Sequence, residues 1–165
     1  MFTRFLSLVL VGGLLIAVAP ANAQQKEFIG AAKCKMCHNK PPQGEQYNKW
    51  AASKHSKAMA SLKGDEAKNP KCLKCHSTAA GLTLSDTQTI TIAEGVSCES
   101  CHGAGSAYKA PAIMKDQAKA KAAGMIIPDE ALCKKCHNAE SPHFKGFDYK
   151  TALAKIAHPN PSRGQ

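Results

Sequence analysis

The chain has 165 residues, with 22 Lys and Arg against 12 Asp and Glu, which gives a formal net charge of +10. This length fits a single domain, and aromatic residues make up only 5% of it, which is little for an ordinary apolar core. All 8 cysteines lie in four C-x-x-C-H motifs, which excludes a disulfide framework and a free catalytic thiol.

The N-terminus predicts a secretory signal peptide over residues 1–23. Arg4 gives a basic start, residues 5–19 are apolar, and residues 21–23 form an A-x-A cleavage site. A retained membrane anchor is the alternative, but the apolar run is shorter than the roughly 20 residues that a span needs. We therefore expect one domain over residues 24–165 with no membrane span, in a bacterial periplasm, with export beyond an outer membrane as the alternative.

The first half of this domain predicts two helices, Phe28–His38 and Gly44–Leu62. In the longer one, helical spacing places Trp50, His55 and Met59 on roughly one face.

The second half predicts a β-hairpin followed by helices. Leu82–Ile92 alternates apolar and β-branched residues about a Ser-Asp-Thr turn, which is typical of a small hairpin. Further helices are expected over Pro111–Gly124, from Pro128 into the fourth motif, and over Phe147–His158.

The C-x-x-C-H motif is the signature of c-type haem attachment. Two thiols at this spacing reach the two vinyl groups on one edge of a porphyrin, and the next residue offers its imidazole to the iron. Zinc binding and dithiol redox chemistry are alternatives, but neither needs a histidine directly after each cysteine pair. The sequence therefore predicts four covalently bound haem c groups, attached at Cys34 and Cys37, Cys72 and Cys75, Cys98 and Cys101, and Cys133 and Cys136, with His38, His76, His102 and His137 as iron ligands.

Four haems in so short a chain would themselves form the core. The predicted fold is mainly α: a compact multihaem cytochrome with short helices packed on four haems and one small β-hairpin. Haem propionates would nearly cancel the positive charge, so the lysines do not indicate nucleic acid. A basic patch for an acidic redox partner and a plain solvated surface both remain open.

The histidine count makes the haems inequivalent. Of 7 histidines, four lie in the motifs, which leaves His55, His143 and His158 as second axial ligands. At most three haems can then be bis-His, and the fourth either takes Met114 or stays five-coordinate. The alternatives are a packed core residue for His55, an exposed loop histidine for His143, and core filling for Met114.

The chain resembles the tetrahaem cytochrome c-554 family over about residues 30–159. The resemblance depends on Tyr47-x-x-Trp50-x-x-Ser53-x-His55-x-x-Ala58-Met59, on Gly95-Val96-Ser97-Cys98-Glu99-Ser100-Cys101-His102-Gly103 and on Lys155-Ile156-Ala157-His158-Pro159. It implies a mostly helical fold with two closely stacked haem pairs and a short β-hairpin.

The same resemblance implies particular iron ligands. His55 would bind the haem of His102, and His158 the haem of His137. Met114 would replace a family histidine on the first haem, because residues 105–115 contain no histidine. The haem of His76 would be five-coordinate or capped by His143.

Electron transfer is the predicted function, because no catalytic triad, paired catalytic carboxylates or phosphate-binding loop is visible. Its partners would be other cytochromes or a quinol-linked reductase or oxidase. The alternatives are a small haem reductase that acts on a nitrogen oxide at a five-coordinate haem, and a unit of a polymeric cytochrome.

Overall fold

The computed structural model describes residues 26–161, and this part of the chain forms eight α-helices and no β-strand. The α-helices are α1 (Ala31–His38), α2 (Gln46–Ala52), α3 (Pro70–His76), α4 (Cys98–His102), α5 (Pro111–Met114), α6 (Gln117–Ala122), α7 (Glu130–Lys134) and α8 (Tyr149–Ile156). Short 3-10 helices lie between them: η1 (Pro41–Gln43), η2 (Ala58–Ser61), η3 (Gly64–Lys68), η4 (Ile92–Glu94) and η5 (Gly105–Ala107). The prediction of a mainly α fold is confirmed.

The motif helices begin where local side chains cap them. Asn69 accepts a hydrogen bond from the Lys71 N–H at the start of α3, and Ser97 accepts one from the Glu99 N–H at the start of α4. Asp129 does the same at the start of α7. Caps of this kind satisfy backbone N–H groups that have no partner inside the helix. The chain thereby fixes where these three short motif helices begin.

The expected single helix over Gly44–Leu62 is wrong. Helix α2 ends at Ala52, Ser53 is extended, and the chain then turns through His55 into η2. The Ser53 hydroxyl accepts from the His55 N–H, and the Ser56 hydroxyl donates to backbone carbonyls of the preceding turn. Serine hydroxyls compete with helical hydrogen bonds, so His55 lies in a turn and not on a helix face.

The predicted β-hairpin over Leu82–Ile92 is also wrong, because the segment is a loop that bonds to the N-terminal segment instead of to itself. Ser85 and Thr87 donate to the Glu27 carboxylate, and Thr89 donates to the Ile29 carbonyl. Ile90 is buried beside that segment. Tertiary hydrogen bonds have replaced the expected strand ladder.

The predicted helix over Pro111–Gly124 is divided in two. Helix α5 ends at Met114, and Asp116 caps the start of α6 by accepting from the Lys119 N–H. The break between α5 and α6 thus lies at the residue whose side chain caps α6.

The apolar core of the described residues is small. Its buried apolar side chains are Ile29, Ala31, Ala79, Ile90, Tyr108 and Ala120. They come mainly from the N-terminal segment, the loop before η4 and the region after α4, so the core lies beside the first and third motifs. Ordinary domains of this size bury about two thirds of the surface of their unfolded chain, and six buried apolar side chains among the described residues are few for such a domain.

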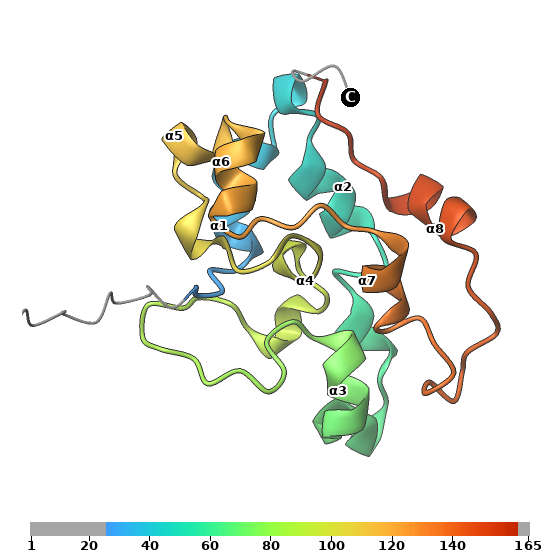
Figure 1. Ribbon diagram of the computed structural model, residues 1–165. Coiled ribbons are helices and arrows are strands. Elements are labelled where there is room, and N and C mark those ends of the chain that lie inside the picture. The colour runs from blue at the N-terminus through green and yellow to red at the C-terminus, as the bar shows by residue number, and fades with distance from the viewer. Residues whose placement is uncertain (1–25, 162–165) are drawn as a thin grey trace, which may run out of the picture.

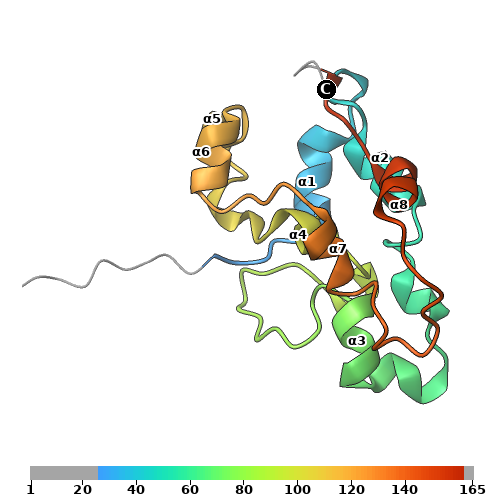
Figure 2. The same cartoon turned by 45° about the vertical axis from the view of Figure 1, so that its right-hand side comes forward.

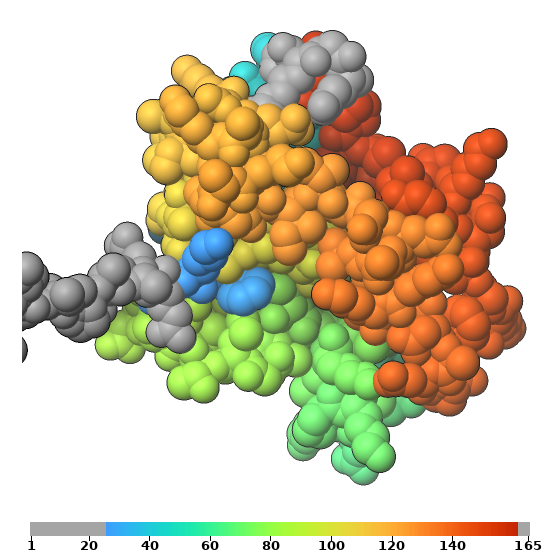
Figure 3. Space-filling view, in the orientation of Figure 1, coloured from blue at the N-terminus to red at the C-terminus, as the bar shows by residue number. Residues whose placement is uncertain are grey.

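Figures 1 and 2 show how the elements are arranged: α7 lies beside α4 and above α3 in both views. In the space-filling view of Figure 3, the orange segment with α6 and α7 covers much of one face, and the green segment with α3 projects below it.

None of the helices in residues 26–161 has the length and apolar character needed to cross a bilayer. The predicted signal peptide, residues 1–23, lies outside the described residues.

Candidate functional site

The four cysteine pairs lie on or directly after α1, α3, α4 and α7, and all 8 thiols are free of disulfides. A hydrogen bond joins the side chains of Cys34 and Cys98, and it lowers the pKa of the Cys34 thiol. The first motif therefore meets the third, although more than 60 residues separate them in the sequence.

The fourth motif contacts both the second and the third. Burial raises the pKa of Cys136 to about 11, and the neighbouring Cys75 thiol adds to this effect. Burial also raises the pKa of Cys101, and the negative charge of the nearby Cys133 thiolate raises it further. The cysteines thus place the motifs in the spatial order first, third, fourth, second.

Three motif histidines are oriented by a hydrogen bond at Nδ1. The distance is 2.9 Å from His76 Nδ1 to the Ala58 carbonyl, and 3.0 Å from His102 Nδ1 to the Ile126 carbonyl. His38 Nδ1 lies 3.3 Å from Gln46 Oε1. A carbonyl that accepts from Nδ1 fixes the tautomer and leaves Nε2 as the metal ligand, which is the usual arrangement around metal-bound histidines.

Two pairs of histidine rings lie close together, each pair joining a motif histidine to a histidine outside the motifs. The ring centres of His55 and His137 are 6.0 Å apart, and those of His102 and His158 are 5.9 Å apart. Two imidazoles that bind one metal ion from opposite sides, at about 2 Å per metal–nitrogen bond, have ring centres about 6 Å apart. Both separations fit an iron atom between the rings.

These contacts differ from the ligand pairing that the resemblance implies. His55 faces the histidine of the fourth motif, not His102, and His158 faces the histidine of the third motif, not His137. The turn after α2 carries His55 toward the fourth motif, whereas the chain after α8 returns to α4. Secondary structure near each histidine contains no information on which motif it meets.

Burial keeps these imidazoles neutral. It lowers the pKa of His55, His102 and His137, because the charged form loses its hydration. Only a neutral imidazole has a lone pair for a metal. His158 Nδ1 also lies 2.9 Å from the Ile156 carbonyl, which directs its other nitrogen away from the backbone. His137 in addition stacks on Phe147, with ring centres 4.7 Å apart.

Hydrogen bonds hold the turn that contains His55 against the segment that precedes the third motif. The Trp50 indole N–H donates to the Val96 carbonyl at 2.8 Å, and the Val96 N–H donates to the His55 carbonyl at 3.0 Å. Gly95, at φ +70°, passes so close that a Cβ atom would lie 2.8 Å from the His55 carbonyl oxygen. Trp50 and Gly95 therefore both help to fix the position of the turn that carries His55.

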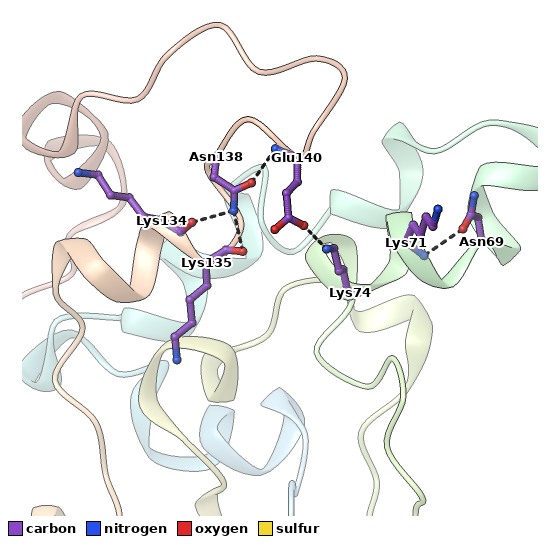
Figure 4. A network of polar contacts seen from close by, with 7 residues as sticks. All are labelled: Asn69, Lys71, Lys74, Lys134, Lys135, Asn138 and Glu140. Carbon is purple, nitrogen blue, oxygen red and sulfur yellow. Dashed lines mark hydrogen bonds and ion pairs between the residues drawn. The ribbon is translucent and has the colours of Figure 1, made fainter.

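The loop that carries His143 is tethered to the second motif. Lys74 of α3 forms an ion pair with Glu140, whose N–H donates to the Asn138 side chain, as Figure 4 shows. Asn138 in turn donates to the carbonyls of Lys134 and Lys135, which closes the end of α7. His143 itself is exposed, so its role as a ligand stays a prediction.

Met114 is the last residue of α5 and is half-buried. Its role as a ligand also stays a prediction.

A cavity of about 500 Å³ adjoins His76. Its wall comes from residues 52–61, including Ser53, Lys54, Lys57 and Ser61. Within residues 26–161, no three His, Cys, Asp or Glu side chains gather in a way that would hold a bare metal ion.

Sequence reasoning missed the two carboxyl groups that join the first and third motifs. Glu99 is only 2% exposed and accepts hydrogen bonds from three backbone N–H groups, while Glu94 accepts one from Ala31. An acidic residue between the two cysteines of a motif was the available signal for Glu99. Nothing in the sequence pattern indicated a buried role for Glu94, because an isolated Glu is usually exposed to solvent.

Thiol pairs that each precede a histidine, together with two facing histidine pairs, define the site of a c-type cytochrome. The family "Cytochrome c554 and c-prime" matches residues 33–103, which include the first three motifs. A curated relative, cytochrome c-554 of Nitrosomonas europaea, is 28% identical over 156 residues. The match covers 75% of this chain and 63% of the length of the relative. No solved structure matches the chain.

The two comparisons agree with each other: the chain is similar to cytochromes of the c-554 family, and it spans less than two thirds of the length of the curated relative.

Proposed function

We propose that this protein binds four haem c groups, one at each motif, and transfers electrons between redox partners. Two histidine pairs carry the proposal: His55 with His137, and His102 with His158. The ring centres in each pair are at the separation that an iron atom between them would require. The small polypeptide core supports it too, because four porphyrins would supply the missing apolar body. When bound, each haem supplies an iron that gains and loses one electron.

The chain itself orders and orients these groups. The cysteine contacts support the sequence of attachment sites first, third, fourth, second. Hydrogen bonds at Nδ1 of the motif histidines would hold each imidazole in one orientation. Such fixed ligands keep the surroundings of each iron similar in both oxidation states, so little rearrangement accompanies the transfer of an electron.

The first and second motifs would complete their iron sites differently. His38 and His76 remain after the facing pairs are formed, and Met114 and His143 are the candidates for their second ligands. A methionine raises the potential of a haem above that of a bis-His neighbour. The alternative of a haem reductase for a nitrogen oxide is not favoured by the comparisons.

The setting of the protein follows from its N-terminus and its charge. Residues 1–23 would direct export of the chain to the periplasm, where they would be removed and c-type haem would be attached. Residues 54–74 contain six exposed lysines against two acids, close to the second motif. This lysine surface suits an acidic redox protein, such as another cytochrome or a quinol-linked reductase or oxidase.

Mass spectrometry and EPR of the purified holoprotein test this proposal. We expect a mass increase of four haems, and two of them should give bis-His low-spin signals. His55→Ala and His158→Ala should each convert one of these haems to high spin, whereas in His143→Ala both of these signals should persist and any change should be confined to a haem outside the two pairs. Fewer than four haems, or unchanged spectra in both of the first two variants, would contradict the proposal.

A further inference from the structure

Glu94 and Glu99 form a carboxyl pair at the N-terminal end of α1. Glu99 accepts from the N–H groups of Ile29, Gly30 and Gly105 at 2.7 to 3.0 Å. Three backbone donors on one carboxyl group hold the Glu99 side chain in one position.

The two carboxyl oxygens of Glu94 differ in their hydrogen bonds. Its Oε1 accepts from the Ala31 N–H at 2.9 Å, whereas its Oε2 is buried and has no hydrogen-bond partner among the described residues. A buried carboxylate oxygen without a donor is unfavourable. Burial raises the pKa of Glu94, the Ala31 N–H acts against this, the negative charge of Glu99 raises it further, and a hydrogen bond from the Ser97 side chain lowers it. Oε2 is therefore the oxygen of this carboxyl at which a proton would displace no hydrogen bond from the described residues.

The pair lies next to two attachment cysteines. The charge of Glu94 acts on Cys34 and on Cys98, whose side chains are hydrogen-bonded to each other. A proton gained or lost by Glu94 therefore changes the charge beside the place where the first and third haems attach. By the same Coulomb interaction, an electron added to either haem must alter the proton affinity of Glu94.

Few other groups near Glu94 can titrate. Glu99 and Cys98 of α4 and Cys34 of α1 face it, together with the hydroxyl of Ser97. Thioether formation removes both cysteines from titration. Tyr108, beside Glu99, stays neutral because burial raises its pKa. Glu94 is thus the group best placed to exchange a proton.

We propose that Glu94 takes up a proton when an electron enters the haem pair of the first and third motifs, so that the protein carries protons together with electrons. This inference rests on the proposed attachment of haem at both motifs. The redox partner supplies the electron, which reduces one Fe(III) to Fe(II). Solvent supplies the proton, which forms an O–H bond at Glu94 Oε2, and both leave on reoxidation.

The sign of the effect is fixed. Reduction adds negative charge, which raises the pKa of the carboxyl further, so the reduced state binds the proton at a higher pH than the oxidised state. Between these two pKa values the reduction potential falls as pH rises, by at most about 59 mV per tenfold change in proton concentration for a one-electron couple. Below both values and above both values, Glu94 contributes no slope.

Spectroelectrochemical titration of the full-length holoprotein over a series of pH values tests the proposal. We expect a pH-dependent potential in the wild type, a smaller slope in Glu94→Gln, and a wild-type slope in the exposed control Asp65→Asn. Glu94→Asp keeps a titrating carboxyl and should retain a slope with a displaced midpoint. The slope that remains in Glu94→Gln belongs to haem propionates.

The infrared difference spectrum of the wild type gives a second readout that needs no variant. Reduction should increase the carbonyl stretch of a protonated carboxylic acid. If this band is absent, or if Glu94→Gln keeps the full slope, Glu94 is not the proton acceptor, while the four haems and their electron transfer stand. If haem is absent from the first or third motif, both the inference and the proposed function are overturned.

Discussion

Replacement of Glu99 by alanine should strongly destabilise the fold. Three backbone N–H groups, from Ile29, Gly30 and Gly105, would lose their acceptor in a region where Glu99 itself is 2% exposed. Each buried donor left unsatisfied costs about 1–3 kcal/mol. Because water and small backbone shifts recover part of this, we expect a loss of about 3 to 5 kcal/mol in the free energy of unfolding.

Denaturant unfolding of the holoprotein, followed by far-ultraviolet circular dichroism, measures this loss. Glu99→Gln keeps one acceptor oxygen and should lose less, about 1–3 kcal/mol. The exposed Asp65→Asn variant is the control and should change little. A Glu99→Ala variant within about 0.5 kcal/mol of the wild type, which is the usual range for surface substitutions, would refute the assigned role of this carboxylate.

Three further predictions concern the other haem sites and the surface. Met114→Ala should lower the potential of one haem or make it high spin, and unchanged EPR and redox titrations would remove Met114 as a ligand. Lys54→Glu with Lys57→Glu should slow the reaction with an acidic redox partner and weaken its dependence on salt; stopped-flow rates at several ionic strengths measure both. Gly95→Ala should lower the free energy of unfolding by about 1–3 kcal/mol, because Cβ would crowd the His55 carbonyl at a positive φ; equal unfolding midpoints would exclude this strain.

The sequence by itself determined the chemistry and the local starts of structure. The repeated motif with its adjacent histidine predicts covalent haem without any tertiary information, and the histidine count predicts that the haems differ. The helix expected from Pro128 begins two residues later, at Glu130, with Asp129 as its cap; the start is nearly right because capping depends on neighbours within one turn. Short-range information was sufficient in each of these cases.

Only the tertiary structure decided which distant residues meet. It brings His55 to His137 and His158 to His102, and it turns the expected hairpin into a loop bonded to Glu27. It also places the unpartnered oxygen of Glu94 beside the first and third motifs. These contacts join segments tens of residues apart, and the pattern of residues within one segment does not encode its partner. The physical reason is that such pairings minimise the free energy of the whole chain, including the burial and hydrogen bonding of groups that no local pattern reveals.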